Sequence, residues 1–285
     1  MRIEYTYKAG AGWSQVAQDL CSLITMGAAA IPILAESVAG LTSVVGEPVG
    51  WGGGGMQISR TDRASGKSLL YEFGTATGAA VDGVFAYALE PENSSPVPVN
   101  ALVCGQNSAA GGAATAQGVI RLAVTENAVI ISFPYGAGRQ IALLGEADGD
   151  YFGAGAYPSH FVMSSQAVVS GLGNDAVSKV PYFPRVKNPA AAGDKVGLNA
   201  CGLAFAVGIS ATNGWVYGVN EAMVYQGLPL DVFSNPKAAH LGFVRDVVLA
   251  PCKSVANDDF LVIAGEQYVV YRENQTAALA LAVKA

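Results

Sequence analysis

Short apolar runs and alternating apolar and polar residues dominate this chain, and both are patterns of β-strands. The first segment, "RIEYTYK", sets Ile3, Tyr5 and Tyr7 against polar neighbours and predicts a strand. The same reasoning predicts strands in "MQISRT", "KSLLYEF", "GVFAYALE", "VIRLAVTE", "AVIISFPY", "RQIALLGEAD", "NACGLAFAVGIS", "GWVYGVN", "FVRDVVLAP" and "LALAVKA". Many short strands with glycine turns predict a mainly β fold, with β-sandwich or barrel-like domains.

One segment has a different period. In "WSQVAQDLCSLIT", Val16, Leu20, Leu23 and Ile24 recur at helical spacing, and Ser14 is placed to cap the first turn. The pattern predicts one short N-terminal helix near residues 14–25. Its apolar face is expected to be buried, either in the chain's own core or against a neighbouring subunit.

Two hairpins are predicted from turn residues. "MQISRT" and "KSLLYEF" flank the turn "DRASG", and "DDFLVIAGEQYVVYRE" holds two apolar runs that meet at Gly265–Glu266. Glycine at the first central position predicts a type II′ turn there.

Residues 105–118, "GQNSAAGGAATAQG", consist largely of small residues and predict a domain boundary or a long surface loop. We therefore expect two β-rich domains, residues 1–112 with the helix and residues 113–285. No period of about 20–50 residues repeats, which excludes a solenoid or a propeller.

The glycine run at 52–55 follows Trp51 and raises the question of a phosphate-binding loop. Neither a helix nor a lysine follows the run, so it is interpreted as a joint between two β-elements. The "GKS" at 66–68 lacks the first glycine of a phosphate-binding loop, because Thr61 stands in its place. No nucleotide cofactor is expected.

The amino-acid composition limits the kinds of partner that this protein is expected to bind. Apolar residues make up 51% and charged residues only 13% of the chain, against about 25% charged in ordinary soluble domains. Either polar strand faces or burial against neighbouring subunits must offset the low share of charged residues. Burial against neighbouring subunits predicts an obligate assembly. The net charge of −6 and the scattered basic residues exclude a basic stripe for direct nucleic-acid binding.

The sequence contains no recognisable catalytic motif, so we expect no enzyme, no cofactor and no metal. Cys21, Cys104, Cys201 and Cys252 are far apart and are expected to be free, mostly buried thiols. His160 is more readily a packed histidine than a base. Two alternatives stay open: long-range disulfides, and calcium held by the carboxylates of Glu146, Asp148 and Asp150 in the loop "EADGD".

A membrane span is not expected. The uncharged segment "LCSLITMGAAAIPILA", residues 20–35, is shorter than the about 20 residues that a spanning helix needs, and Pro32 interrupts it. It also lies too far from the first residue for a signal peptide. We expect it to be buried in protein.

Two stretches carry a family resemblance. "YTYKAGAGWSQVAQDLCSLIT" resembles the openings of structural proteins of tailed-bacteriophage particles, and "DVVLAPCKSVANDDFLVIAGEQYVVYRE" resembles their hairpin-ended tails. Together they cover about a sixth of the chain, and no functional residue is carried over. The resemblance implies a virion component at the neck, tail, baseplate or capsid surface.

These observations together predict a non-enzymatic structural protein. It is expected in the virion, assembled in the cytoplasm of the bacterial host, with itself and other virion proteins as partners. The candidate assembly residues are Trp13, Val16, Leu20, Leu23, Ile24 and Trp51. The alternatives are a carbohydrate-binding or glycan-active module, indicated by the aromatic residues at 151–161 and 182–183, and a hydrolase with a non-standard site.

Overall fold

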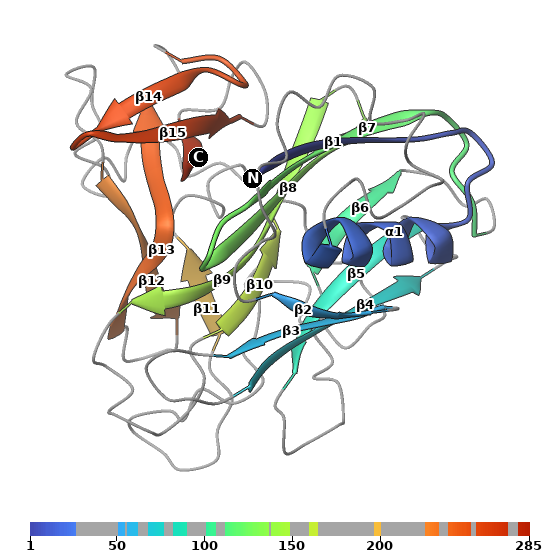
Figure 1. The fold of residues 1–285 in the computed structure, drawn as a ribbon, viewed down its shortest axis with the longest axis horizontal. Coiled ribbons are helices and arrows are strands. Elements are labelled where there is room, and N and C mark those ends of the chain that lie inside the picture. The colour runs from blue at the N-terminus through green and yellow to red at the C-terminus, as the bar shows by residue number, and fades with distance from the viewer. Residues whose placement is uncertain are drawn as a thin grey trace.

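The computed structural model confirms a mainly β protein with one helix in its described part (Figure 1). It describes residues 1–26, 51–54, 56–61, 68–76, 82–89, 101–106, 112–136, 138–148, 160–164, 197–200, 226–233, 239–251, 255–272 and 279–285. The elements in chain order are β1 (Arg2–Tyr7), α1 (Trp13–Met26), β2 (Gly52–Gly54), β3 (Gln57–Thr61), β4 (Ser68–Ala76), β5 (Asp82–Leu89), β6 (Ala101–Gln106), β7 (Gly118–Val124), β8 (Ala128–Tyr135), β9 (Gly138–Asp148), β10 (His160–Ser164), β11 (Gly197–Ala200), β12 (Gln226–Phe233), β13 (Ala239–Pro251), β14 (Phe260–Ile263), β15 (Glu266–Tyr271) and β16 (Leu279–Lys284). "GWVYGVN" and most of "NACGLAFAVGIS" lie outside the described residues.

The smaller sheet has five antiparallel strands in the order β2-β3-β4-β5-β6. The predicted hairpin is confirmed, since Ile58 of β3 pairs with Tyr71 of β4. The interpretation of the glycine run as a joint is wrong for residues 52–54. Gly53 pairs with Ile58, so these glycines form the edge strand β2. Their backbone makes the ladder although they carry no side chains to pack.

The larger sheet has eleven strands in the order β1-β7-β8-β9-β13-β16-β15-β14, with β10 beside β9, and β12 followed by β11 beside β13. Among the described residues, a short pairing joins its two parts, in which Phe243 and Val244 of β13 lie opposite Asp148 and Ala147 of β9. The described strands do not close into a barrel, because β1 and β14 end the order. A sandwich-like architecture is compatible with this arrangement.

The core lies between the two sheets. Ile3, Leu122, Ile131 and Ala142 are successive cross-strand partners on one face of β1, β7, β8 and β9, and all are buried. This face shares its core with β3–β6 and α1, and β6 packs against β8. The alternating pattern of these strands in the sequence therefore reflects one shared apolar interior.

The helix α1 connects the two layers (Figure 1). It packs on the five-stranded sheet, while the Tyr5 hydroxyl of β1 donates to the Asp19 Oδ2 of α1 at 2.9 Å. Its apolar face is buried as predicted, and its exposed residues Ser14, Gln15 and Gln18 face solvent. The helix begins at Trp13, so Ser14 lies inside the first turn and is not the cap. The Gly12 carbonyl accepts the first helical bond, from Val16.

The described core is continuous across the predicted boundary at 112/113. β1 pairs with β7 along its whole length, and Gly12 forms an isolated bridge with Ala113. The Gln106 side chain donates to the Ala113 carbonyl at 3.1 Å and accepts from the Thr115 amide at 2.8 Å. The described part of the 105–118 segment is therefore held by the chain itself.

The C-terminal hairpin is confirmed, but its turn is shifted by one residue. Ile263 pairs with Glu266, so the two-residue loop is Ala264–Gly265. Both residues have positive φ, 52° and 84°, which defines a type I′ turn and makes the expectation of type II′ wrong.

Within the described residues, α1 is too short to cross a membrane. Leu20, Leu23 and Ile24 are buried in the protein, as expected for the start of the apolar segment. Residues 27–35 of that segment lie outside the described residues.

Candidate functional site

The residues predicted for assembly all lie in the chain's own core. Five of them are on α1 and are fully buried, and Trp51 is 6% exposed. The Trp51 ring lies 5.4 Å from that of Tyr71, and its Nε1 donates to the Thr125 carbonyl at 2.9 Å. Their burial is explained within one chain, so the surface available to a partner must be sought elsewhere.

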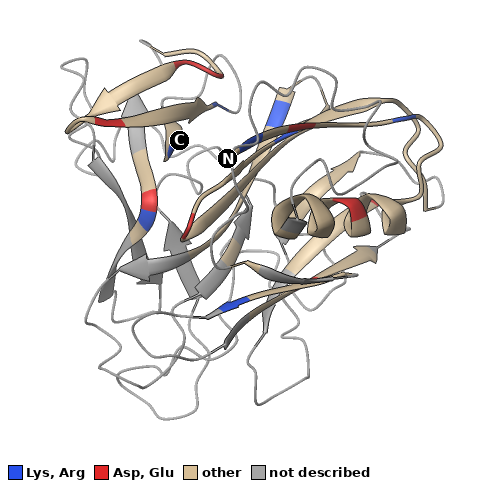
Figure 2. Cartoon of the chain, in the orientation of Figure 1, with Lys and Arg blue, Asp and Glu red and all other residues tan. Residues whose placement is uncertain are grey.

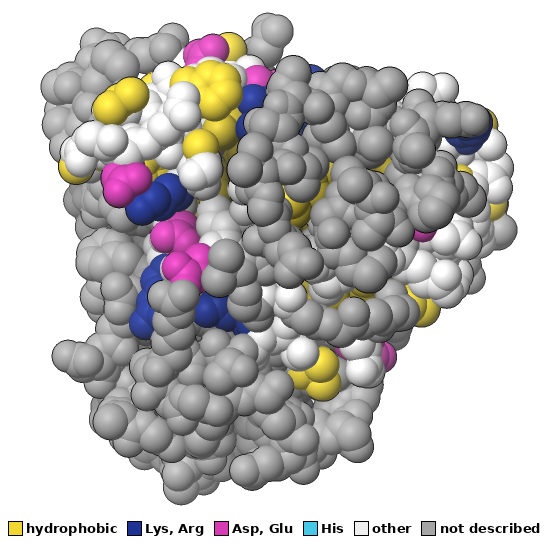
Figure 3. All heavy atoms as spheres, viewed as in Figure 1, with side chains coloured by type: hydrophobic (Ala, Val, Ile, Leu, Met, Phe, Trp, Pro, Cys, Tyr) yellow, Lys and Arg dark blue, Asp and Glu magenta, His cyan; other side chains and the backbone are white. Residues whose placement is uncertain are grey.

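The candidate contact surface is the edge strand β14. Phe260 is 54% exposed and Val262 is 72% exposed, and these are the large hydrophobic side chains that stand out in the described part of the chain. Figure 3 shows hydrophobic side chains on the surface where Figure 1 places β14 and β15. Hydrophobic side chains on an unpaired strand edge are suited to contact another chain.

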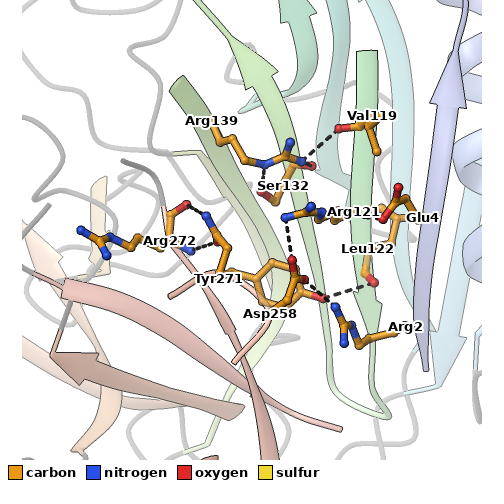
Figure 4. Close-up of polar contacts among 11 residues, drawn as sticks. Arg2, Glu4, Val119, Arg121, Leu122, Ser132, Arg139, Asp258, Tyr271 and Arg272 are labelled. Carbon is orange, nitrogen blue, oxygen red and sulfur yellow. Dashed lines mark hydrogen bonds and ion pairs between the residues drawn. The ribbon is translucent and has the colours of Figure 1, made fainter. Parts of the chain in front are cut away.

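An ionic cluster fixes this hairpin to the rest of the molecule (Figure 4). The Asp258 carboxylate, just before β14, pairs with Arg2 of β1 and with Arg121 of β7, the latter at 2.7 Å. Arg121 also lies 3.8 Å from Glu4. The Arg2 guanidinium lies 5.4 Å from the centre of the Phe260 ring. The cluster therefore joins the start of β14 to the opposite edge of the same sheet.

A partly buried arginine and a buried tyrosine lie beside the cluster. Arg139 donates to the Ser132 hydroxyl at 2.9 Å and to the Val119 carbonyl at 3.0 Å. Burial, with a contribution from the nearby Arg121, lowers the pKa of Arg139. Burial raises the pKa of Tyr271, whose hydroxyl donates to the Leu122 carbonyl at 3.4 Å. These groups hold β7, β8 and β15 in fixed relation.

A second polar cluster surrounds the turn between β7 and β8. Asp246 of β13, at a φ of 63°, accepts hydrogen bonds from the Thr125 hydroxyl at 2.9 Å and the Asn127 side-chain amide at 2.8 Å. Arg60 of β3 donates to the Asn127 side-chain oxygen at 3.4 Å and lies over the Trp51 ring. One turn thus contacts both sheets, and its role is to position them.

The described cysteines, which are the candidate nucleophiles in the described part of the chain, are buried in the core. Cys21 and Cys104 are free and buried, and burial raises the pKa of the Cys21 thiol to about 12, which keeps it protonated and unreactive. The described part of the chain holds no cluster of three or more metal-binding side chains. The side chains of His160, Cys201, Cys252 and the "EADGD" carboxylates lie outside the described residues, so those expectations stay predictions.

Charged residues are few on the strands of the five-stranded sheet (Figure 2), whereas the ionic contacts gather around β14, β1 and β7. The described arrangement is therefore suited to hold an apolar strand edge in place for contact. No protein-family model matches the chain. No curated protein matches it either.

No pattern in the sequence indicates that Phe260 and Val262 are exposed. "FLVI" is a continuous apolar run, which is the pattern of a strand buried on both faces. Exposure follows from the position of β14 at the end of the sheet, and that position depends on β16 lying beside β15. A local pattern contains no information about such a distant neighbour.

Proposed function

We propose that this protein is a non-enzymatic structural component of a tailed-phage virion, which acts by assembling with copies of itself and with other virion proteins. The observation that carries the proposal is the exposed apolar edge of β14, with Phe260 and Val262 facing solvent. A strand edge of this kind gains both backbone hydrogen bonds and apolar burial when another chain covers it.

Two features of the sequence support the same proposal. The chain has only 13% charged residues, so burial between subunits would offset its apolar composition. The stretches at 5–25 and 246–273 resemble tailed-phage structural proteins, and the second contains β14 itself. The proposed location is the virion, after assembly in the bacterial host cytoplasm, and the interface would bury more than about 2,000 Å², as obligate interfaces do.

Sedimentation velocity of the purified chain over a range of concentrations tests the proposal. We expect species well above the 29.1 kDa of one chain. Val262→Lys should lower the oligomer fraction, because it places a charge in the contact. Gln18→Lys, on the exposed side of α1, is the matched control and should leave the fraction unchanged.

A stable, soluble monomer at micromolar concentration would contradict the proposal. The carbohydrate-binding alternative would then come first, and its aromatic residues at 151–161 and 182–183 lie mostly outside the described residues. Binding of the monomer to a glycan array would support that alternative directly.

A further inference from the structure

The edge strand β14 is short, but it lacks the protection against pairing that charge, proline or a bulge gives to other edge strands. Phe260–Ile263 contains no charged residue and no proline, and its pairing with β15 has no register shift. Natural edge strands normally use such features to prevent contact between chains. Their absence from this strand indicates an edge that is meant to be covered.

The backbone groups at this edge have a definite direction. In a hairpin with a two-residue loop, the residues that flank the loop exchange hydrogen bonds, and the pairs alternate from there. Ile263 and Leu261 therefore bond to β15, in agreement with the bond from the Val270 amide to the Asp259 carbonyl at 3.0 Å. The N–H and C=O groups of Phe260 and Val262 point away from β15, toward the side of β14 on which no described strand lies.

The exposed side chains belong to these same two residues. Side chains alternate between the faces of a strand, so Phe260 and Val262 lie on one face, next to the buried Val269 across the strand pair. An incoming strand must satisfy two conditions together. It must bond to the backbone of Phe260 and Val262, and it must cover their side chains on that face.

A second copy of β14 satisfies both conditions in one antiparallel register. With Leu261 opposite the second copy's Leu261, Phe260 lies opposite the second copy's Val262, and Val262 opposite its Phe260. Each of these outer pairs then exchanges backbone hydrogen bonds, and the four exposed side chains form one apolar strip. The arrangement has two-fold symmetry, the commonest in homo-oligomers.

Charge favours this register over a parallel one. The exposed acidic residues Asp259 and Glu266 lie on either side of β14 along the chain. In the antiparallel register Asp259 faces the apolar Ile263 of the second copy. A parallel in-register pair would place each Asp259 beside its copy, and like charges directly opposite each other are destabilising.

We propose that two copies of this protein pair through β14 in this register, joining their larger sheets into one continuous sheet. The proposal rests on the proposed function, since it names one of the contacts by which the subunits assemble. The strand is short, so the pair is expected to be weak by itself and to be strengthened when further contacts close a larger assembly.

Disulfide formation in the oligomeric protein tests the register. Leu261 and the second copy's Leu261 would form a non-hydrogen-bonded pair, with Cα atoms about 4.5 Å apart, within the about 4.4–6.8 Å that a disulfide spans. We expect Leu261→Cys to give a covalent dimer on mild oxidation. Val262→Cys should not, because the two 262 positions would lie about 8 Å apart, given the rise of a strand.

A mixture of differently tagged Phe260→Cys and Val262→Cys chains should give a linked heterodimer. The wild type, oxidised in the same way, measures the background from its four native cysteines. Because Leu261 is partly buried, Val262→Lys provides a second measurement at a position whose side chain faces solvent. Combined with Leu261→Cys in the same chain, it should lower the yield of covalent dimer below that of Leu261→Cys alone.

The outcomes separate this inference from the proposed function. Oligomers by sedimentation without a Leu261→Cys dimer would overturn β14 self-pairing and leave the proposed function standing. A dimer from Val262→Cys alone would overturn the register. Binding of a different protein that Val262→Lys prevents, with no self-linking, would show another occupant and overturn the inference. A monomer at every concentration would overturn both.

Discussion

At the scale of single residues, Gly118 illustrates how closely β1 and β7 pack. It lies opposite Tyr7, and a Cβ at this position would clash with the Tyr7 hydroxyl oxygen. The Tyr7 ring is buried and lies 5.6 Å from the Trp13 ring, so it has little room to move. We expect Gly118→Ala to lower the free energy of unfolding by about 1–3 kcal/mol in urea titration.

The control for Gly118→Ala is Gly12→Ser. No atom lies within 4 Å of a Cβ at Gly12, and serine is preferred at the start of a helix. This variant should be as stable as the wild type or slightly more stable. Equal unfolding midpoints for Gly118→Ala and the wild type would contradict the close packing of the Tyr7 ring on Gly118.

Asp258 is the residue on which the ionic cluster depends. Its side chain is 28% exposed and those of Arg2 and Arg121 are 38% and 31% exposed, so solvent screens the pairs in part. We expect Asp258→Asn to lower the free energy of unfolding by about 1 kcal/mol. Asparagine keeps the shape and tolerates the φ of 70° at this position.

Measuring the effect of Asp258→Asn on stability at several salt concentrations distinguishes the contribution of charge from that of packing. The difference between Asp258→Asn and the wild type should shrink toward about 1 M salt, where the screening length falls to about 3 Å. Glu4→Gln is the matched control, because Glu4 is 56% exposed and 3.8 Å from Arg121. A loss of stability that is the same at all salt concentrations would show that packing, and not charge, is the cause.

At the scale of elements, the turn of the β14–β15 hairpin is not optimal. Ala264 has a φ of 52°, a conformation that costs a residue with a Cβ about 1–2 kcal/mol. Asparagine is preferred at this position of a type I′ turn. We expect Ala264→Asn to raise the free energy of unfolding by about 0.5–1 kcal/mol, measured by denaturant titration.

A substitution at the second turn residue should change the stability in the opposite direction. Gly265 has a φ of 84° with open space around its Cβ position, so Gly265→Ala adds backbone strain and no clash. It should destabilise the hairpin. If both variants shifted stability in the same direction, the type I′ assignment would be wrong.

Elements were predictable where the pattern is local. The helix from Trp13 and the strands β7, β8 and β9 follow from apolar spacing, because each has one face in the core. The turn at Ala264–Gly265 was misplaced because alanine seldom adopts a positive φ, so the sequence favoured glycine as the first turn residue. The sequence pattern does not predict β2, because a strand of glycines has no side chains that could form an apolar pattern.

The candidate site was not predictable from sequence. Trp51 and the α1 residues were chosen for assembly because they are large and apolar, and such residues serve a core as readily as an interface. Only the order of the strands distinguishes a core position from an interface position. That order places β14 at the end of the sheet and α1 between the layers.

At the scale of the whole molecule, the buried phenols and thiols predict that the protein loses stability at alkaline pH. Burial raises the pKa of Tyr5, Tyr7 and Tyr271 above the ordinary 10.0, and those of Cys21 and Cys104 above 9.0. As the pH rises, these groups lose their protons at a lower pH in the unfolded chain than in the folded protein. Their stabilisation is therefore complete below about pH 9 and is lost as the pH rises, by up to about 1.4 kcal/mol per pH unit for each group.

Urea titrations from pH 7 to strongly alkaline pH, followed by phenolate absorbance, measure this effect. Tyr271→Phe removes one buried phenol, whose hydroxyl donates a long bond to the Leu122 carbonyl, and should flatten the fall in stability above pH 10. Stability that does not change with pH across this range would contradict the burial of these groups.

The position of β16 also governs the order in which the larger sheet can form during synthesis. β16 lies between β13 and β15, and β15 pairs only with β16 and β14 among the described strands. A nascent chain that stops before residue 279 can form the β14–β15 hairpin but has no strand to attach it to β13. The edge proposed for contact between copies is thus placed only after the other described strands have been made, so chains that stop before residue 279 would lack a correctly placed edge and would be excluded from assembly.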